Sequence, residues 1–140
     1  AQILLLLQEL QSEFDMGLIL ITHDLGVVAR IATRVAVMYA GQIVEQGTVK
    51  QIFDNPMHPY TRGLMRCIPV PGKTKPGEPL GSIPGMVPSL VGKFTGCRFA
   101  ERCDHVTDAC RQSDIELRAE SGETQSYRCI IDAKEMAKVA

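Results

Sequence analysis

Residues 18–25 read LILITHDL, and this stretch decides the fold class. The run up to Thr22 is apolar and too short for a helix, so it fits a strand that is buried on both faces. Strands of this kind belong to parallel sheets that are flanked by helices. The sequence therefore predicts an α/β fold with His23 at the carboxyl end of a buried strand, the position where open α/β sheets bind ligands.

Apolar periodicity extends this prediction to both sides of the strand. Asp24 falls in the first turn of the next expected helix, where the positive helix N-terminus favours a carboxylate. Ala40 and Gly41 form the expected two-residue turn of a hairpin, and Thr48 is suited to cap a helix. The predicted helices cover residues 3–14, 25–32, 49–53 and 60–67, and the predicted strands cover residues 18–22, 34–39 and 42–47.

His23 has two interpretations. A histidine at a strand end can reach a bound phosphate with a ring N–H, but a residue that merely caps the next helix is the more common case. The wider sequence favours the first interpretation. Residues 21–25 (ITHDL) and 35–47 (VAVMYAGQIVEQG) closely resemble the end of an ABC-transporter ATPase domain.

The resemblance covers residues 1–54 and implies a role for one histidine. In that family the histidine is the switch residue that touches the γ-phosphate of ATP, and the hairpin that follows closes the domain. By resemblance, His23 contacts the γ-phosphate and positions the attacking water, which is the work that phosphoryl transfer requires. MgATP is the implied cofactor, and residues 1–54 are expected to be the C-terminal part (strand, helix, strand and hairpin) of a P-loop ABC ATPase domain.

The phosphate-binding loop of that family is missing from the sequence. It would precede His23, as would the glutamine loop, the signature motif and the catalytic glutamate, and none is present. Residues 72–74 read GKT, but Cys67 stands where the motif needs a glycine, and Lys75-Pro76-Gly77 stands where it needs a helix. We therefore expect that this chain alone does not bind or hydrolyse ATP.

A second motif narrows the family. Residues 55–64 (NPMHPYTRGL) resemble the N-P-x-H-P-Y-T-x-x-L segment in the ATP-binding subunits of oligopeptide, dipeptide and nickel importers. Pro56 and Pro59 fix the backbone, so the segment is interpreted as a rigid turn in which Tyr60 packs on the preceding domain. His58 is accordingly predicted to be structural rather than catalytic.

This resemblance implies a set of partners and a location. The parent protein would hydrolyse ATP to power the import of peptides or a related small solute. It would pair with a second ATPase subunit and act on two membrane permease subunits, without touching the transported solute. Its place would be peripheral, on the cytoplasmic face of the inner or plasma membrane.

Proline and glycine density separates the two expected domains. Residues 68–95 hold so many of both that a regular helix or a central strand is excluded, which predicts an extended connector. The expected division is an ATPase part over residues 1–54 and an extension over residues 55–140. The extension contains the connector 68–95 and a four-cysteine module over residues 96–131.

The module carries four cysteines in the spacing C-x5-C-x6-C-x18-C, namely Cys97, Cys103, Cys110 and Cys129. Four thiolates can ligate a [4Fe–4S] cluster or a structural zinc ion, although the short C-x2–4-C pairs of zinc fingers are lacking. The same spacing occurs in the C-terminal extension of peptide-importer ATPases, where some members hold an iron–sulfur cluster. The resemblance therefore implies a [4Fe–4S] cluster, with zinc, disulfides or unmetallated thiols as alternatives.

The surroundings of these cysteines suggest how a metal would act. Residues 96–131 have few apolar side chains, so a metal centre would stabilise a segment that core burial alone could not hold. Each cysteine is next to an arginine in the sequence, and positive charge favours thiolate. His105 is either a substitute ligand or, by preference, an exposed loop residue, and Cys67 is expected to be a lone buried thiol.

Charge and hydropathy argue against a nucleic-acid-binding protein and against a membrane-spanning one. The 15 basic and 16 acidic residues give a formal net charge of −1, which is no footprint for nucleic acid. The longest apolar run, Ile3–Leu7, is far shorter than the roughly 20 residues of a membrane-spanning helix. Two alternatives without ATP chemistry remain, a stand-alone metal-binding interaction module built on the four cysteines and a redox sensor.

Overall fold

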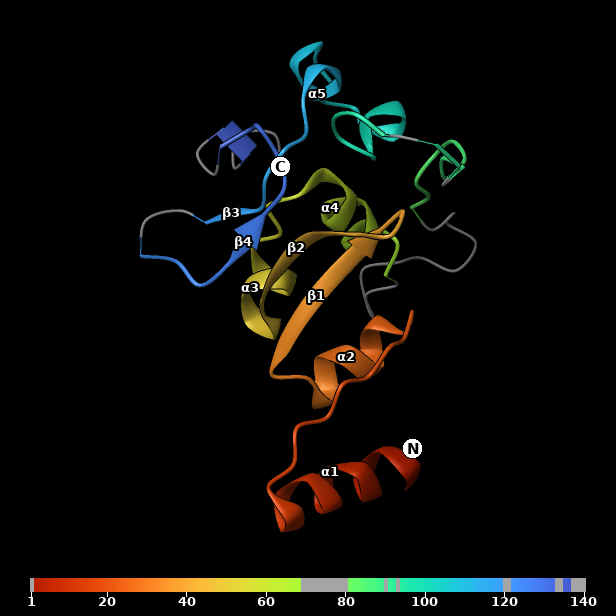
Figure 1. Cartoon of the computed structure of the whole chain (residues 1–140). Helices are drawn as coiled ribbons and strands as arrows, with labels where there is room; N and C mark the ends of the chain where they lie inside the picture. The colour runs from red at the N-terminus through yellow and green to blue at the C-terminus, as the bar shows by residue number, and fades with distance from the viewer. Residues whose placement is uncertain are drawn as a thin grey trace. The chain divides into compact units, whose positions relative to one another are not determined.

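The computed structural model of the 140-residue chain describes residues 2–68, 81–89, 91–92, 94–119, 122–132 and 135–136. The chain divides into two compact units, Ala1–Thr33 and Arg34–Ala140. Figure 1 shows the elements of each unit along the colour gradient.

The first unit contains two helices, as the sequence predicted. Helix α1 spans Gln2–Phe14 and helix α2 spans Leu25–Ile31. Asp24 is the N-cap of α2, where its Oδ1 accepts hydrogen bonds from the backbone N–H groups of Gly26 (2.9 Å) and Val27 (3.1 Å). These bonds satisfy two of the donors that a helix N-terminus leaves free. No helix in the described part of the chain is long and apolar enough to cross a membrane.

The predicted buried strand over residues 18–22 is absent, which corrects the sequence analysis. These residues have no regular secondary structure, and the side chains of Ile19 and Ile21 are 91% and 94% exposed. A strand of this type needs neighbouring strands to pair its backbone and layers to cover both faces. None of the described strands pairs with residues 18–22, so the apolar pattern has nothing to be buried against.

The second unit is built on an antiparallel sheet that contains the predicted hairpin, whereas the parallel sheet expected around residues 18–22 is not found among the described strands. Strand β1 (Arg34–Tyr39) and strand β2 (Gln42–Thr48) form the predicted hairpin. Ala40 (φ 47°) and Gly41 (φ 74°) occupy the two turn positions that need positive φ, which is why glycine suits the second. Two short strands from the extension, β3 (Arg118–Ala119) and β4 (Ser126–Tyr127), complete the order β1-β2-β4-β3 (Figure 1).

Two helices follow the hairpin, close to their predicted positions. Helix α3 spans Val49–Asp54 and helix α4 spans Pro59–Arg66. Thr48 caps α3 as expected, and a capping box forms because Gln51 Oε1 also accepts from the Thr48 N–H at 2.9 Å. The extension adds a 3-10 turn, η1 (Ala100–Arg102), and helix α5 (Ala109–Gln112).

The described part of the expected connector is irregular, as its composition predicted. Residues 81–89 contain no helix or strand. Residues 69–80, 90 and 93 lie outside the described part, and so does the GKT sequence at 72–74.

The core of the second unit joins the hairpin to the four-cysteine region. Among the described residues, one buried cluster consists of Val37, Tyr39, Val44, Ile52 and Phe99, and a second consists of Met57, Tyr127, Cys129 and Met136. Phe99, from the extension, packs edge-on against Tyr39 with ring centroids 5.2 Å apart, and Tyr60 lies 4.7 Å from Tyr39 and 5.4 Å from Phe99. Aromatic pairs at these separations add to the area they bury. Tyr60 therefore packs on the hairpin as predicted, and the extension supplies part of the same core.

A buried carboxylate ties three segments together. Glu45 is fully buried in β2, and its Oε1 accepts hydrogen bonds from the Met57 N–H (2.7 Å) and from Gln125 Nε2 (2.7 Å). Its Oε2 accepts from the His58 N–H at 3.0 Å. Gln125 also donates to the Asn55 carbonyl at 2.9 Å. Three donors thus compensate the desolvation of this carboxylate, and together they fix the start of α4 and the strand β4 on the hairpin.

His58 is structural, as predicted. The side chain is buried, and its Nδ1 accepts a hydrogen bond from the Tyr60 N–H at 3.1 Å, which caps α4. Burial lowers the pKa of His58 from 6.5 to about 4, against the opposing effect of a hydrogen bond with the Arg128 backbone. The ring is therefore neutral at pH 7, which leaves Nδ1 free to accept.

Replacing Glu45 with Ala should destabilise the unit Arg34–Ala140 by about 3 kcal/mol, because buried N–H donors lose their acceptor. Tyrosine fluorescence during urea unfolding measures this unit alone, since all three tyrosines, Tyr39, Tyr60 and Tyr127, lie in it. Glu116→Ala, at an exposed site of the same unit, should stay within about 0.5 kcal/mol of the parent. Equal stabilities of the two variants would contradict a structural role for Glu45.

Acid should weaken the same unit through His58. Its folded pKa of about 4 lies below its unfolded value of 6.5, so the unfolded state binds the proton more tightly. Stability should be fully present above pH 6.5 and should fall by about 3 kcal/mol as the pH drops to 4. His58→Asn keeps a capping side chain without the titration. The difference in unfolding free energy between parent and variant, measured from pH 7.5 to 4, should shrink by that amount, whereas a constant difference would refute the assignment.

Candidate functional site

His23 stands in the loop that leads into α2. The residue is exposed, and it lies between Thr22 and the helix cap Asp24. Thr22 Oγ1 accepts a hydrogen bond from the Asp24 N–H at 3.0 Å. The two neighbours of His23 are therefore both engaged in holding the loop at the helix start, while the imidazole itself extends into solvent. Such a side chain is available to a ligand but does not form a binding site alone.

The four cysteines of the extension approach one another in the fold. The Cys97 N–H donates to the Cys110 carbonyl at 2.7 Å, which joins two segments 13 residues apart. Gly96 makes this approach possible, since a Cβ at that position would lie 2.4 Å from the Cys110 carbonyl oxygen, and its φ of 85° is one that glycine tolerates. Cys110 and Cys129 are buried, while Cys97 and Cys103 are half-buried, and all are free of disulfides.

The thiols also influence one another electrostatically. The pKa of Cys103 is raised to about 11, first by burial and to a smaller extent by Cys129, Cys97 and Cys110, against the opposing effect of a hydrogen bond with the His105 backbone. Burial is also the main cause of the raised pKa values of Cys97 and Cys129, and both of these thiols are affected by Cys110. The four sulfur atoms therefore belong to one neighbourhood, in which ionisation of one thiol opposes ionisation of the others.

The four thiols are of the right chemical type to bind a metal, but their arrangement is not that of a metal site. Four clustered thiols are chemically suited to iron or zinc. Among the described residues, however, no group of three or more His, Cys, Asp or Glu side chains is arranged so that it could hold a metal ion. The fold thus brings the predicted ligands together without setting a coordination shell.

The arginines next to the cysteines do not play the role expected from the sequence. Arg102 donates to the carbonyls of Pro84 (2.8 Å) and Ile83 (2.7 Å), and Arg128 donates to those of Ile43 (3.0 Å) and Ile115 (2.6 Å). Arg98 likewise donates to the Ala40 carbonyl, and Arg111 pairs with Glu101. Three of these guanidinium groups bind backbone carbonyls and the fourth pairs with a carboxylate, and the pKa values of Cys97, Cys103 and Cys129 are raised rather than lowered.

Three other side chains differ from expectation or were missed. His105 is half-buried and lines a cavity, whereas the sequence favoured an exposed loop. Cys67 is only half-buried, at the C-terminal end of α4. Glu45 was missed because an alternating strand pattern placed it on a half-exposed surface, and its main partners, Met57 and Gln125, are 12 and 80 residues away. No local signal could have found it.

Comparison with known proteins finds a family model and relatives that all concern peptide transport. Residues 44–110 match the family model described as the C-terminal region of oligopeptide/dipeptide transporters. The chain is 52% identical over 134 residues to a Brucella ovis protein provisionally described as a peptide import ATP-binding protein. It is 50% identical over 119 residues to a dipeptide transport ATP-binding protein of Haemophilus influenzae, and 45% identical over 135 residues to that of Escherichia coli.

These matches cover most of this chain but a smaller share of each relative. The three alignments include 93%, 84% and 95% of the chain, and 39%, 35% and 41% of the respective relatives. The chain thus spans about two fifths of the length of the curated relatives it matches. Residues 44–110 are thus similar to the C-terminal region of oligopeptide/dipeptide transporters, and nearly the whole chain is similar to ATP-binding proteins of peptide import and dipeptide transport.

Proposed function

We propose that this chain is part of the ATP-hydrolysing subunit of an importer for peptides or a related small solute. The observation that carries the proposal is the 52% identity to a peptide import ATP-binding protein over 93% of the chain. The dipeptide transport proteins of two further organisms support it at 45–50% identity. As an ATP-binding subunit, the parent would use MgATP, associate with a second ATPase subunit and drive two permease subunits from the cytoplasmic face of the membrane.

Within that subunit, His23 is proposed to be the switch residue that contacts the γ-phosphate. Two features of this chain support the role. The imidazole is exposed, so a phosphate oxygen can reach it, and the loop on both sides is fixed by Thr22 and Asp24. A donor held in this way stabilises charge that develops on the transferred phosphoryl group without reorganising at the moment of reaction.

In the complete subunit, His23→Ala should lower the ATP turnover number by roughly 100-fold or more, the usual effect of removing a donor to a developing oxyanion. Affinity for a nucleotide should be largely kept, because the phosphate-binding loop supplies most of it. A coupled phosphate-release assay and a fluorescent-nucleotide titration measure the two quantities separately.

The matched control for this experiment is Glu9→Ala, which removes an exposed side chain of α1 in the same unit. Its turnover should equal that of the parent. His23→Gln retains an N–H donor without a titratable ring and should recover part of the rate. Turnover at the parental rate in His23→Ala would refute the switch role. A loss of nucleotide affinity as large as the loss of rate would show that His23 contributes to nucleotide binding as well as to catalysis, which would also contradict the proposal.

We also propose that Cys97, Cys103, Cys110 and Cys129 ligate a [4Fe–4S] cluster, with zinc as the alternative metal. The pKa values of Cys97, Cys103 and Cys129 are each raised in part by Cys110, and those of Cys103 and Cys129 also by Cys97, which supports this choice of ligands. A bound metal would act as a cross-link between the segments that carry the four cysteines. The role of the chain is to bring the thiols together, through the Cys97–Cys110 backbone hydrogen bond and the close approach at Gly96.

Metal analysis of anaerobically purified protein tests this assignment. We expect about four iron atoms and four sulfides per chain, or one zinc ion, with a Cys103→Ser variant losing most of the metal. Cys67→Ser, which removes the fifth thiol, should keep it. Near-ultraviolet circular dichroism should show that metal loss disorders the extension. Metal at background level in the parent, or equal retention in both variants, would overturn the proposal.

A further inference from the structure

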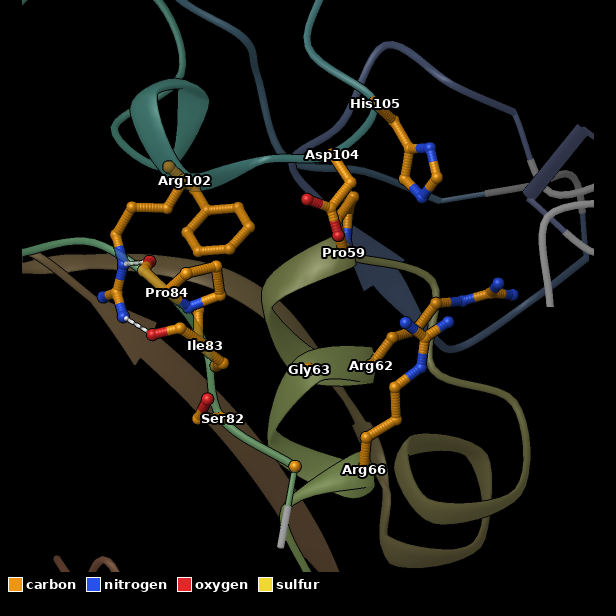
Figure 2. A pocket seen from close by; sticks show the side chains of 12 residues that line it. Pro59, Arg62, Gly63, Arg66, Ser82, Ile83, Pro84, Arg102, Asp104 and His105 are labelled. Carbon is orange, nitrogen blue, oxygen red and sulfur yellow. Dashed lines mark hydrogen bonds between the residues drawn. The ribbon is translucent and has the colours of Figure 1, made fainter. Parts of the chain in front are cut away.

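A basic cavity lies beside α4, and its lining includes Asp104 and His105, which follow the proposed metal ligand Cys103 in the sequence. It has a volume of about 100 Å³ and is lined by α4, by residues 81–84 and by residues near η1. A single water needs roughly 10–15 Å³ of such space, so the cavity is large enough for an oxyanion with some of its hydration. Figure 2 shows its lining side chains, with Arg62 and Arg66 on α4 and His105 above them.

Two like charges meet at this cavity. Arg62 and Arg66 are four residues apart on α4, a spacing that puts side chains on the same face of a helix and makes like charges repel. Burial and then the charge of Arg66 lower the pKa of Arg62, and Glu45 partly offsets them. Within the described part of the chain, neither guanidinium forms an ion pair, since the pairs found there are Lys50–Asp54 and Arg111–Glu101.

Most of the N–H donors on these two arginines have no hydrogen-bond acceptor among the described residues. Arg62 donates from Nε to the Pro56 carbonyl at 2.8 Å, which orients its guanidinium. Its terminal amino groups, and the whole guanidinium of Arg66, make no hydrogen bond with another described residue. His105 is half-buried and also lines the cavity. Asp104, the one carboxylate of the lining, is exposed, and Figure 2 draws it over Pro59 rather than between the two guanidinium groups.

Figure 2 draws residues 82–84 on one side of α4 and the Arg62 and Arg66 side chains on the other, and specific contacts hold residues 81–84 in place. A Cβ on Gly63 would lie 3.0 Å from Ile83 Cδ1, and a Cβ on Gly81 would lie 2.7 Å from the Arg66 carbonyl oxygen. These close approaches press residues 81–84 onto α4. On the other side, Arg102 holds the carbonyls of Ile83 and Pro84, as the dashed lines in Figure 2 show. The cavity is therefore shaped before any ligand arrives, which reduces the entropic cost of binding.

From this arrangement we infer that the cavity between Arg62, Arg66 and His105 binds a phosphoryl oxyanion. Two planar guanidinium forks match a doubly charged tetrahedral anion in charge and in number of acceptor oxygens better than they match one carboxylate. An anion between the two arginines would also replace their repulsion with attraction. Free phosphate and a membrane-borne phosphate monoester share this chemistry. The inference does not depend on ATP hydrolysis or on a metal centre.

The first test uses this 140-residue chain, which carries no phosphate-binding loop to compete. Inorganic phosphate is titrated at constant ionic strength, and the backbone amide resonances of residues 62–66 and 105 are followed by NMR. A saturable shift is expected in the parent. Arg66→Gln, at an exposed side chain, should weaken binding by about tenfold, because hydrogen bonds to a charged group are lost. Arg66→Lys keeps the positive charge but not the planar guanidinium, so its affinity for phosphate should lie between those of the parent and Arg66→Gln.

Lys50→Gln is the matched control, since it removes one exposed positive charge from the same unit. It should change the affinity by less than about twofold, because an exposed charge outside the cavity is screened by salt. A second arm measures cosedimentation with phosphatidylcholine vesicles that do or do not contain phosphatidic acid. If the chain binds phosphatidic acid vesicles only when Arg66 is present, and does not bind inorganic phosphate, the oxyanion is the headgroup of a lipid. Equal losses in Arg66→Gln and Lys50→Gln, or no saturable binding in either arm, would overturn the inference.

Discussion

The second unit of the structure depends on one buried carboxylate. Glu45 lies within the hairpin, yet its oxygens accept from the backbone that precedes α4 and from a glutamine near the end of the chain. A buried charge is costly unless hydrogen bonds replace its hydration. Here that requirement can be met only if the segment 55–58 and residue 125 are both in place. The carboxylate thus makes folding of the hairpin and folding of the extension interdependent.

Apolar and cationic side chains of the extension also contact the hairpin. Phe99 completes an aromatic cluster with Tyr39 and Tyr60, and β4 extends the sheet on the free side of β2. Arginines of the extension donate to carbonyls of the hairpin, as Arg98 does to Ala40 and Arg128 does to Ile43. The extension is therefore continuous with the hairpin core. The boundary predicted between residues 54 and 55 is crossed by the sheet, the core and the Glu45 hydrogen bonds.

Features with local causes were predictable from the sequence. The hairpin turn requires positive φ at Ala40 and Gly41, and the caps at Asp24 and Thr48 rest on a side chain that reaches two or three residues ahead. These interactions are contained within a few residues, so composition and spacing reveal them. The interpretation of His58 as a structural residue succeeded for the same reason, because prolines on both sides restrict its backbone.

Features with distant causes were not predictable. The strand over residues 18–22 was inferred from its apolar pattern, but a strand forms only where other strands pair with it. Glu45 has the appearance of a surface residue until the partners 12 and 80 residues away are known. The cavity beside α4 combines three segments whose meeting no pattern encodes. The cysteine spacing did identify residues that converge, although not the geometry in which they do so.

The central claim is that Glu45 makes the hairpin and the extension one cooperative unit. Amide hydrogen exchange of the native chain tests it most directly at the Met57 and His58 N–H groups, which donate to Glu45, and at the Arg128 N–H, which donates to the Val44 carbonyl. We expect these three amides to exchange as slowly as those of β1 and β2, with a free energy of opening equal to that of unfolding the unit. Rapid exchange at these amides while β1 and β2 stay protected would contradict the account.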